Sequence, residues 1–263
     1  MSRTVLPLAL LLSLLVGCRG KPEREAVRAE PAPEVLVKAV ASPPAVPPEP
    51  PPPPAPLPPA TVETLPVPGD HDASIVRGTS SAPPTTIFLP GMCSNGAAYL
   101  HTFPEAARAR GGVVAIEGDA PCGAPNSGFR TFSWDVDKQR TRIEAALEAA
   151  GTVANDPLTI IGYSQGASFA EQLARRLPAR YARIVIIGAP TDPSPASFAK
   201  SRSVVTMSCS ADVPARMRNA SRAIERTGVP ALYLEMPKCT HGNVTEGERI
   251  FGEAFSFLDT HAR

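Results

Sequence analysis

The segment Gly162-Tyr163-Ser164-Gln165-Gly166 places a serine between two glycines, where an apolar run ends and an amphipathic stretch begins. A sharp turn from strand to helix at this point would lift the Ser164 hydroxyl above a sheet. Such a turn crowds the residues two before and two after the serine, so only small side chains fit there. The start of the helix also offers partial positive charge to a developing oxyanion. The pattern predicts that Ser164 is a nucleophile; the alternative is a tight turn with an ordinary surface serine.

A serine hydroxyl becomes a good nucleophile only when a base takes its proton, and histidine commonly serves as that base. The chain has four histidines. His241 lies in a loop between the last predicted strand and the last predicted helix, and this loop can reach over Ser164. His71 lies at a domain boundary, His101 early in a helix and His261 near the end of the sequence. We therefore predict His241 as the base; the alternative is a surface loop histidine.

The base needs an acid that fixes its tautomer and supports the imidazolium. Asp212 is the candidate, because it follows the strand that precedes the histidine-bearing strand. Asp192 follows the strand before that one and is the rival. Asp212 also stands two residues before Pro214, where it could instead cap a helix. We predict Asp212 as the acid, which gives the chain order Ser164, Asp212, His241.

The elements that must position these residues alternate between strand and helix patterns. Short apolar runs predict strands at Thr85–Leu89, Gly112–Glu117, Leu158–Tyr163, Arg183–Gly188, Ser203–Ser208 and Ala231–Glu235, with a further edge strand at Ala73–Arg77. Apolar residues at helical spacing predict helices around 136–150, 167–177, 214–224 and 250–258. Nearly continuous apolar runs are typical of strands buried on both faces of a parallel sheet. The sequence therefore predicts an α/β fold, a mostly parallel sheet with helices on both faces, whose ligands bind at the carboxyl ends of the strands.

From about Thr85 to Phe257 the chain resembles a small α/β-hydrolase, on the Gly-Tyr-Ser-Gln-Gly motif and the order Ser, Asp, His. The resemblance implies a three-layer α/β-hydrolase fold and a serine esterase-like activity. It also implies an oxyanion hole of two backbone N–H groups. One belongs to Gln165, and the other comes from the loop Leu89-Pro90-Gly91-Met92-Cys93, where Pro90 replaces the histidine common in the family. We assign this second donor to Met92, with Cys93 as the alternative.

Two features bear on the space around the nucleophile. The connection between the strands ending near Gly188 and starting near Ser203 is short, which predicts a minimal lid and an open site. Phe129, Phe132 and Trp134 lie in the loop after the strand that ends near Glu117. These aromatic side chains either wall an acyl pocket or pack into the core beneath a helix.

The first part of the chain differs in composition from the rest. An apolar run from Val5 to Val16 follows one arginine; it is too short for a membrane span of roughly 20 residues and is typical of a secretory signal. It ends at Gly17-Cys18 and resembles a bacterial lipobox, so we predict a lipoprotein signal peptide over residues 1–17 and lipidation of Cys18; the alternative is an ordinary signal peptide with a chance cysteine. Residues 18–69 are predicted as a Pro-rich disordered linker, because proline lacks a backbone donor and favours extended chain. The hydrolase domain is predicted over 70–263.

Four cysteines remain beyond the lipidated one: Cys93, Cys122, Cys209 and Cys239. An even number in an exported chain indicates two disulfides. A bond between Cys209 and Cys239 would join the loops that carry the predicted acid and base, and Cys93 would then pair with Cys122. Four cysteines allow three connectivities, so this pairing is a hypothesis, and inert buried thiols are the alternative.

Together these features predict a serine hydrolase that cleaves carboxylic esters through an acyl-enzyme, held by its lipid anchor in the bacterial cell envelope, on the periplasmic or cell-surface side. The expected partners are a small-molecule or envelope ester substrate and the membrane, and we expect a monomer. The formal net charge of +1 gives no basic surface for nucleic acid. The sequence has no phosphate-loop pattern and no metal-ligand spacing, so we expect no cofactor and no metal. The alternatives are a thioesterase or peptidase of the same fold, and a non-catalytic binding module that keeps the hydrolase fold.

Overall fold

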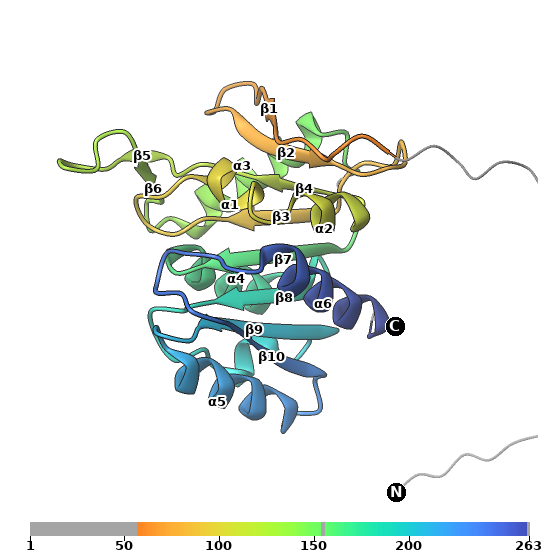
Figure 1. The fold of residues 1–263 in the computed structure, drawn as a ribbon, viewed down its shortest axis with the longest axis vertical. Coiled ribbons are helices and arrows are strands. Elements are labelled where there is room, and N and C mark those ends of the chain that lie inside the picture. The colour runs from red at the N-terminus through yellow and green to blue at the C-terminus, as the bar shows by residue number, and fades with distance from the viewer. Residues whose placement is uncertain (1–56, 154–155, 262–263) are drawn as a thin grey trace, which may run out of the picture. The chain divides into compact units, whose positions relative to one another are not determined.

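The computed structural model describes residues 57–153 and 156–261; the predicted signal peptide, Cys18 and most of the predicted linker lie outside them. Its main sheet has the order β1-β2-β4-β3-β7-β8-β9-β10, from top to bottom in Figure 1. The strands from β4 to β10 in that order are parallel, whereas β2 is antiparallel to both β1 and β4. These strands are β1 (Glu63–Leu65), β2 (Ala73–Arg77), β3 (Thr86–Leu89), β4 (Gly112–Ala115), β7 (Leu158–Tyr163), β8 (Tyr181–Ile187), β9 (Ser203–Cys209) and β10 (Ala231–Met236).

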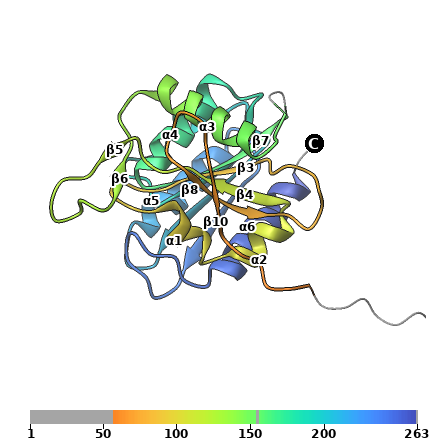
Figure 2. The ribbon, with the colours of Figure 1, turned by 90° about the horizontal axis from the view of Figure 1, so that it is seen from above.

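Helices cover both faces of the sheet, as Figures 1 and 2 show. One face packs against α3 (Val136–Ala149), α4 (Gln165–Arg176) and α5 (Pro214–Glu225). The other face packs against α1 (Gly96–Leu100), α2 (Pro104–Ala109) and α6 (Gly247–Thr260). Every residue of β3, β7 and β9 is buried, which explains why apolar residues and small hydroxyl residues fill these strands. The predicted three-layer α/β architecture is confirmed.

The helix starts follow from local chemistry. The Asp135 carboxylate accepts a hydrogen bond from the Lys138 N–H and so caps α3. Pro214 begins α5, where its missing N–H costs nothing. The sequence predicts one helix around His101, whereas the structure has two short helices there, α1 and α2, and His101 lies at the C-terminal end of α1. The two-stranded ribbon of β5 (Ala120–Pro121) and β6 (Arg130–Thr131) was not expected from the sequence. In the described part of the chain, no helix combines the length and apolar character needed to cross a bilayer.

The folded part begins earlier than residue 70, where the sequence predicts the linker to end. Strand β1 pairs with β2, so β2 is not the edge strand that its sequence suggests. Leu65 and Val67 are each only 5% exposed and belong to the core. The Ala60 N–H also donates to the Glu105 carboxylate on α2. The prolines around this short strand predict a linker, so the sequence pattern does not indicate the strand.

The connection between β8 and β9 contains a single turn of 3₁₀ helix at Pro195–Phe198 and lies close against the domain. The Phe198 side chain is fully buried. The Glu171 carboxylate of α4 accepts hydrogen bonds from the Ser194 N–H and the Ser197 hydroxyl. This segment is therefore bound to α4 and the core, as the predicted minimal lid requires.

Candidate active site

Ser164, Asp212 and His241 meet at the carboxyl edge of the sheet, each from a different strand end. Ser164 directly follows β7, Asp212 lies three residues after β9, and His241 lies five residues after β10. His241 Nε2 lies 2.9 Å from Ser164 Oγ, and His241 Nδ1 lies 2.8 Å from Asp212 Oδ2. The Asp212 side chain is 9% exposed and that of His241 is 46% exposed. A neutral histidine here donates its Nδ1 proton to Asp212 and offers Nε2 to the serine hydroxyl.

The alternatives left open for the acid are separated by their contacts. Asp192 is 89% exposed and forms an ion pair with Arg216 at 3.0 Å, on the outside of α5. Asp212 does not cap α5, because Val213 holds the cap position and no side chain caps this helix. The structure therefore brings Asp212, and not Asp192, to His241.

The turn at Ser164 has the crowded geometry that the two glycines predict. Ser164 adopts a φ of 51°, a left-handed value that is uncommon for a residue with a side chain. A Cβ on Gly162 would lie 2.3 Å from the Gly166 carbonyl oxygen. A Cβ on Gly166 would lie 2.1 Å from the Leu89 carbonyl oxygen. The first glycine therefore permits the turn itself, and the second lets α4 pack against the end of β3.

Both residues predicted as oxyanion donors belong to segments that lie beside Ser164. A Cβ on Gly91, the residue before Met92, would lie 3.3 Å from the Ser164 Cβ. Gln165 begins α4, and its buried amide oxygen accepts hydrogen bonds from the Phe132 N–H and the Thr131 hydroxyl. Its amide nitrogen donates to the Phe132 carbonyl at 2.8 Å. These bonds fix the side chain of Gln165, the residue directly after Ser164.

Two buried tyrosines hold the base loop, residues 237–246 between β10 and α6, at the residue after the histidine. The Gly242 N–H donates to the Tyr163 hydroxyl at 2.7 Å, and the Tyr99 hydroxyl donates to the Gly242 carbonyl at 3.1 Å. The two phenol rings stack with centroids 5.1 Å apart. Burial raises the pKa of both phenols, which keeps them neutral and able to hydrogen bond. His241 is thus positioned by contacts to its neighbour in the chain.

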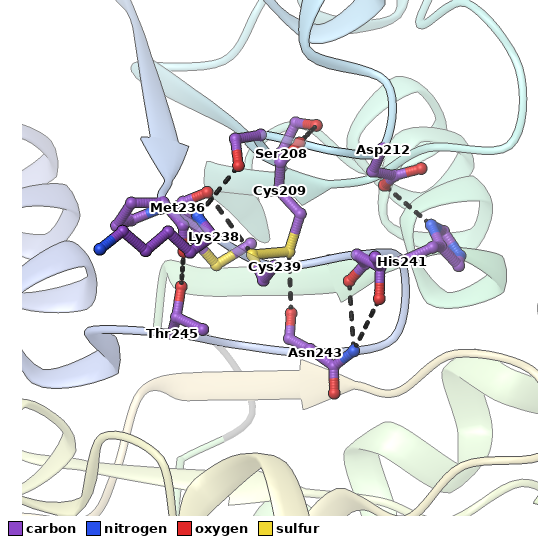
Figure 3. Close-up of a disulfide and its surroundings, with 12 residues drawn as sticks. Ser208, Cys209, Asp212, Met236, Lys238, Cys239, His241, Asn243 and Thr245 are labelled. Carbon is purple, nitrogen blue, oxygen red and sulfur yellow. Dashed lines mark hydrogen bonds and ion pairs between the residues drawn. A yellow bond between two sulfur atoms is a disulfide. The ribbon is translucent and has the colours of Figure 1, made fainter.

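The two disulfides have the predicted pairing, Cys93 with Cys122 and Cys209 with Cys239. The second joins the end of β9 to the base loop, close to Asp212 and His241 (Figure 3). Backbone bonds reinforce this junction, since the Ala211 N–H donates to the Cys239 carbonyl at 3.1 Å. Asp212 and His241 are therefore carried by loops that are covalently joined.

Gly188, directly after β8, leaves the space in which the side chains of Asp212 and His241 meet. A Cβ there would lie 2.9 Å from Asp212 Oδ2 and 3.3 Å from His241 Nδ1, and the residue has a φ of 51°. The sequence analysis did not identify Gly188, although a glycine directly after a buried strand can indicate a position where no side chain fits. It also missed Tyr99 and Tyr163, whose contacts to Gly242 span 143 and 79 residues and leave no local pattern.

The three aromatic residues near the site differ in burial. Phe132 is 2% exposed and packs with Phe169 of α4, which places it in the core. Trp134 stacks on the same Phe169 ring but is 63% exposed. Phe129 is 45% exposed. The core interpretation therefore fits Phe132, while Phe129 and Trp134 remain accessible at the surface.

No family model and no curated protein sequence matches the chain. Solved structures do match its fold. A predicted CIB-like hydrolase from Thermoplasma acidophilum has a TM-score of 0.56 at 16% identity, covering 76% of this chain and 98% of that one. An esterase from Pyrobaculum calidifontis has a TM-score of 0.53 at 14% identity, covering 77% and 85%. A membrane phospholipase A, described as a bacterial virulence factor, has a TM-score of 0.52 at 16% identity, covering 78% and 87%. The sheet order, the turn at Ser164 and these similarities agree that the chain has the α/β-hydrolase fold.

Proposed function

We propose that the protein hydrolyses carboxylic esters with Ser164 as nucleophile, His241 as base and Asp212 as the acid that orients it. The observation that carries this proposal is the continuous contact from Asp212 Oδ2 to His241 and on to Ser164 Oγ, at 2.8 and 2.9 Å. These distances lie within the reach that proton transfer needs. A non-catalytic module of the same fold would not need a hydroxyl, an imidazole and a buried carboxylate in this alignment. The esterases among the structures of similar fold make ester substrates the first to test.

In the proposed reaction, Ser164 Oγ attacks the ester carbonyl carbon while His241 Nε2 takes the hydroxyl proton. The oxyanion that forms accepts hydrogen bonds from the backbone N–H groups of Gln165 and Met92, each worth about 3 kcal/mol in the transition state. His241 then gives its proton to the leaving alcohol, and the acyl group stays on Ser164. A water molecule, deprotonated by His241, releases the acid and restores the serine. The same groups would serve a thioester or an amide.

Replacement of single groups tests the assignment. Ser164→Ala should abolish hydrolysis of p-nitrophenyl acetate and butyrate, and also labelling by a fluorophosphonate. Asp212→Asn should lower kcat by about 10³- to 10⁴-fold, because it reverses the tautomer that the histidine needs. Asp192→Asn is the matched control, since Asp192 is an exposed acid that pairs with Arg216, and the kcat of this variant should stay within about twofold of wild type. A wild-type protein that takes no label and turns over no activated ester would overturn the proposal.

We further propose that a lipid on Cys18 holds this domain in the bacterial cell envelope. The support is the apolar run that ends at Gly17-Cys18 and the Pro-rich segment that follows. In a bacterial host, the wild-type chain should incorporate a labelled fatty acid and sediment with membranes, whereas Cys18→Ala should do neither. Equal membrane association of both chains would refute the anchor without touching the catalytic proposal.

A further inference from the structure

A hollow of about 340 Å³ opens beside the proposed catalytic groups, between the base loop and the segment that follows β3. Gly242, next to His241, lines one side, and Cys93, next to Met92, lines the other. Other lining residues are Ser94, Asn95, Tyr99, Phe129 and Asn243. A substrate whose carbonyl lies over Ser164 would therefore have one of its two halves next to this hollow.

The leaving alcohol is the half that belongs there. The proton that releases it comes from His241 Nε2, so the ester's alcohol oxygen must lie against the base loop. Three consecutive residues of that loop, from Gly242 to Val244, line the hollow. An alcohol group bound in it would be held next to the proton donor.

The lining favours a neutral and polar ligand. None of its side chains is charged at neutral pH, since the only titratable one is the Tyr99 phenol, whose pKa is raised by burial. Side-chain amides come from Asn95 and Asn243. The Ser94 and Thr102 hydroxyls also line the hollow and donate to backbone carbonyls, and the Asn95 amide oxygen caps α1. The Asn243 amide nitrogen donates to the Thr240 hydroxyl at 3.1 Å, while its amide oxygen points away from that contact (Figure 3). This oxygen can accept a hydrogen bond from a ligand hydroxyl.

One aromatic ring gives the hollow an apolar surface. Phe129 is 45% exposed, an uncommon state for a phenylalanine, and it borders the same hollow. Its segment is held in place by the Cys93–Cys122 disulfide and by the backbone bridge between Ser94 and Arg130. An exposed ring beside hydrogen-bonding amides can receive a molecule with an apolar C–H face and polar edges. A sugar ring has this combination, whereas a hydrocarbon chain has no use for the amides.

We propose that this hollow binds the alcohol half of the substrate, and that this half is a neutral, hydroxyl-rich ring, so that the protein removes acyl groups from sugars. The inference rests on the proposed ester hydrolysis. The volume lies at the lower end of the usual 300–1,000 Å³ range for ligand pockets, which suits a single ring. Phe129 would lie against the ring's C–H face, and Asn243 would accept one of its hydroxyl groups.

The test compares two acetate esters that differ only in the alcohol: methyl 6-O-acetyl-glucoside and methyl acetate, with acetate release measured for the full chain. The wild type should prefer the sugar ester by at least tenfold in kcat/KM. Phe129→Ala and Asn243→Ala should each lower this preference about five- to tenfold, mainly through KM, and Phe129→Tyr should restore it. Trp134→Ala is the matched control, because this exposed aromatic residue does not line the hollow, and its preference should equal that of the wild type.

The outcomes separate the two proposals. A wild type that hydrolyses neither acetate nor any activated ester overturns the catalytic proposal, and the sugar proposal with it. A wild type that hydrolyses both acetates equally well overturns the sugar proposal alone. The sugar proposal also fails if Phe129→Ala lowers both activities in proportion, or if decanoyl glycerol is a better substrate than the sugar ester. Binding can also be measured without turnover. The inactive variant Ser164→Ala should give saturation-transfer NMR signals from the bound sugar ester, and these signals should weaken in the double variant that also carries Phe129→Ala.

Discussion

Gly188→Ala tests whether the space at the end of β8 is what allows the acid and base to meet. The added methyl would lie 2.9 Å from Asp212 Oδ2, whereas ordinary contacts begin at 3.4 Å, so the carboxylate must move by about 0.5 Å. The methyl would also press on His241, 3.3 Å from its Nδ1. A misplacement of about 1 Å can cost roughly 100-fold in rate, so we expect a loss of about 10- to 100-fold in kcat.

The substitution also changes stability, and a control separates the two effects. An alanine in the left-handed region costs about 1–2 kcal/mol, which lowers the melting temperature by roughly 2–8 °C in a domain of this size. Gly228→Ala carries the same kind of backbone cost at a φ of 90°, where a Cβ would meet no described atom within 4 Å. We expect both variants to melt earlier and only Gly188→Ala to lose activity on p-nitrophenyl acetate. Equal kcat values for the two variants would refute the idea that Gly188 makes room for the pair.

Three further predictions concern Tyr163, the Cys209–Cys239 disulfide and Asp119. Tyr163→Phe removes the acceptor of the Gly242 N–H, a hydrogen bond worth about 1 kcal/mol, so kcat should fall about fivefold with KM unchanged; an unchanged kcat would show that the loop needs no such anchor. Replacing Cys209 and Cys239 by serine opens a cross-link over 30 residues, which should cost about 3–4 kcal/mol by chain entropy; calorimetry that shows no loss would contradict this. Burial raises the pKa of Asp119, but hydrogen bonds from Lys138, Ser133 and Gln139 outweigh burial and hold the pKa of this carboxyl well below its usual range. Ionised Asp119 therefore stabilises the folded state above about pH 4, and this stabilisation is lost on further acidification. Wild type should melt a few degrees above Asp119→Asn at pH 7, and this difference in melting temperature should shrink between about pH 4 and pH 2.

The sequence predicts the central strands and the larger helices because burial on both faces leaves an unmistakable apolar pattern. It also locates the three proposed catalytic residues, because each follows a strand that ends at the same edge of the sheet. The Gly-Tyr-Ser-Gln-Gly segment is informative on its own, since steric crowding allows only small residues on both sides of the turn.

Other features depend on partners that are distant in the sequence. Strand β1 has no apolar run of its own and exists because it pairs with β2. The β5–β6 ribbon has only two residues in each strand and is fixed from outside, by the Cys93–Cys122 disulfide and the Ser94–Arg130 bridge. The Tyr99 contact to Gly242 joins α1 to the base loop across 143 residues. No local pattern encodes such contacts, because each depends on the completed sheet.

The exposure of His241 explains why several contacts hold the base loop in place. His241 is 46% exposed, and the segment that could have covered it, between β8 and β9, is bound to α4 instead. An uncovered imidazole can turn away to hydrogen bond with water, because little packing holds its side chain. A lid could hold His241 in place by covering it. Here the Cys209–Cys239 disulfide, the hydroxyls of Tyr99 and Tyr163 and the space at Gly188 hold the loop and the imidazole instead. In the proposed reaction, an open site of this kind admits an ester attached to a bulky alcohol while His241 stays aligned with Ser164.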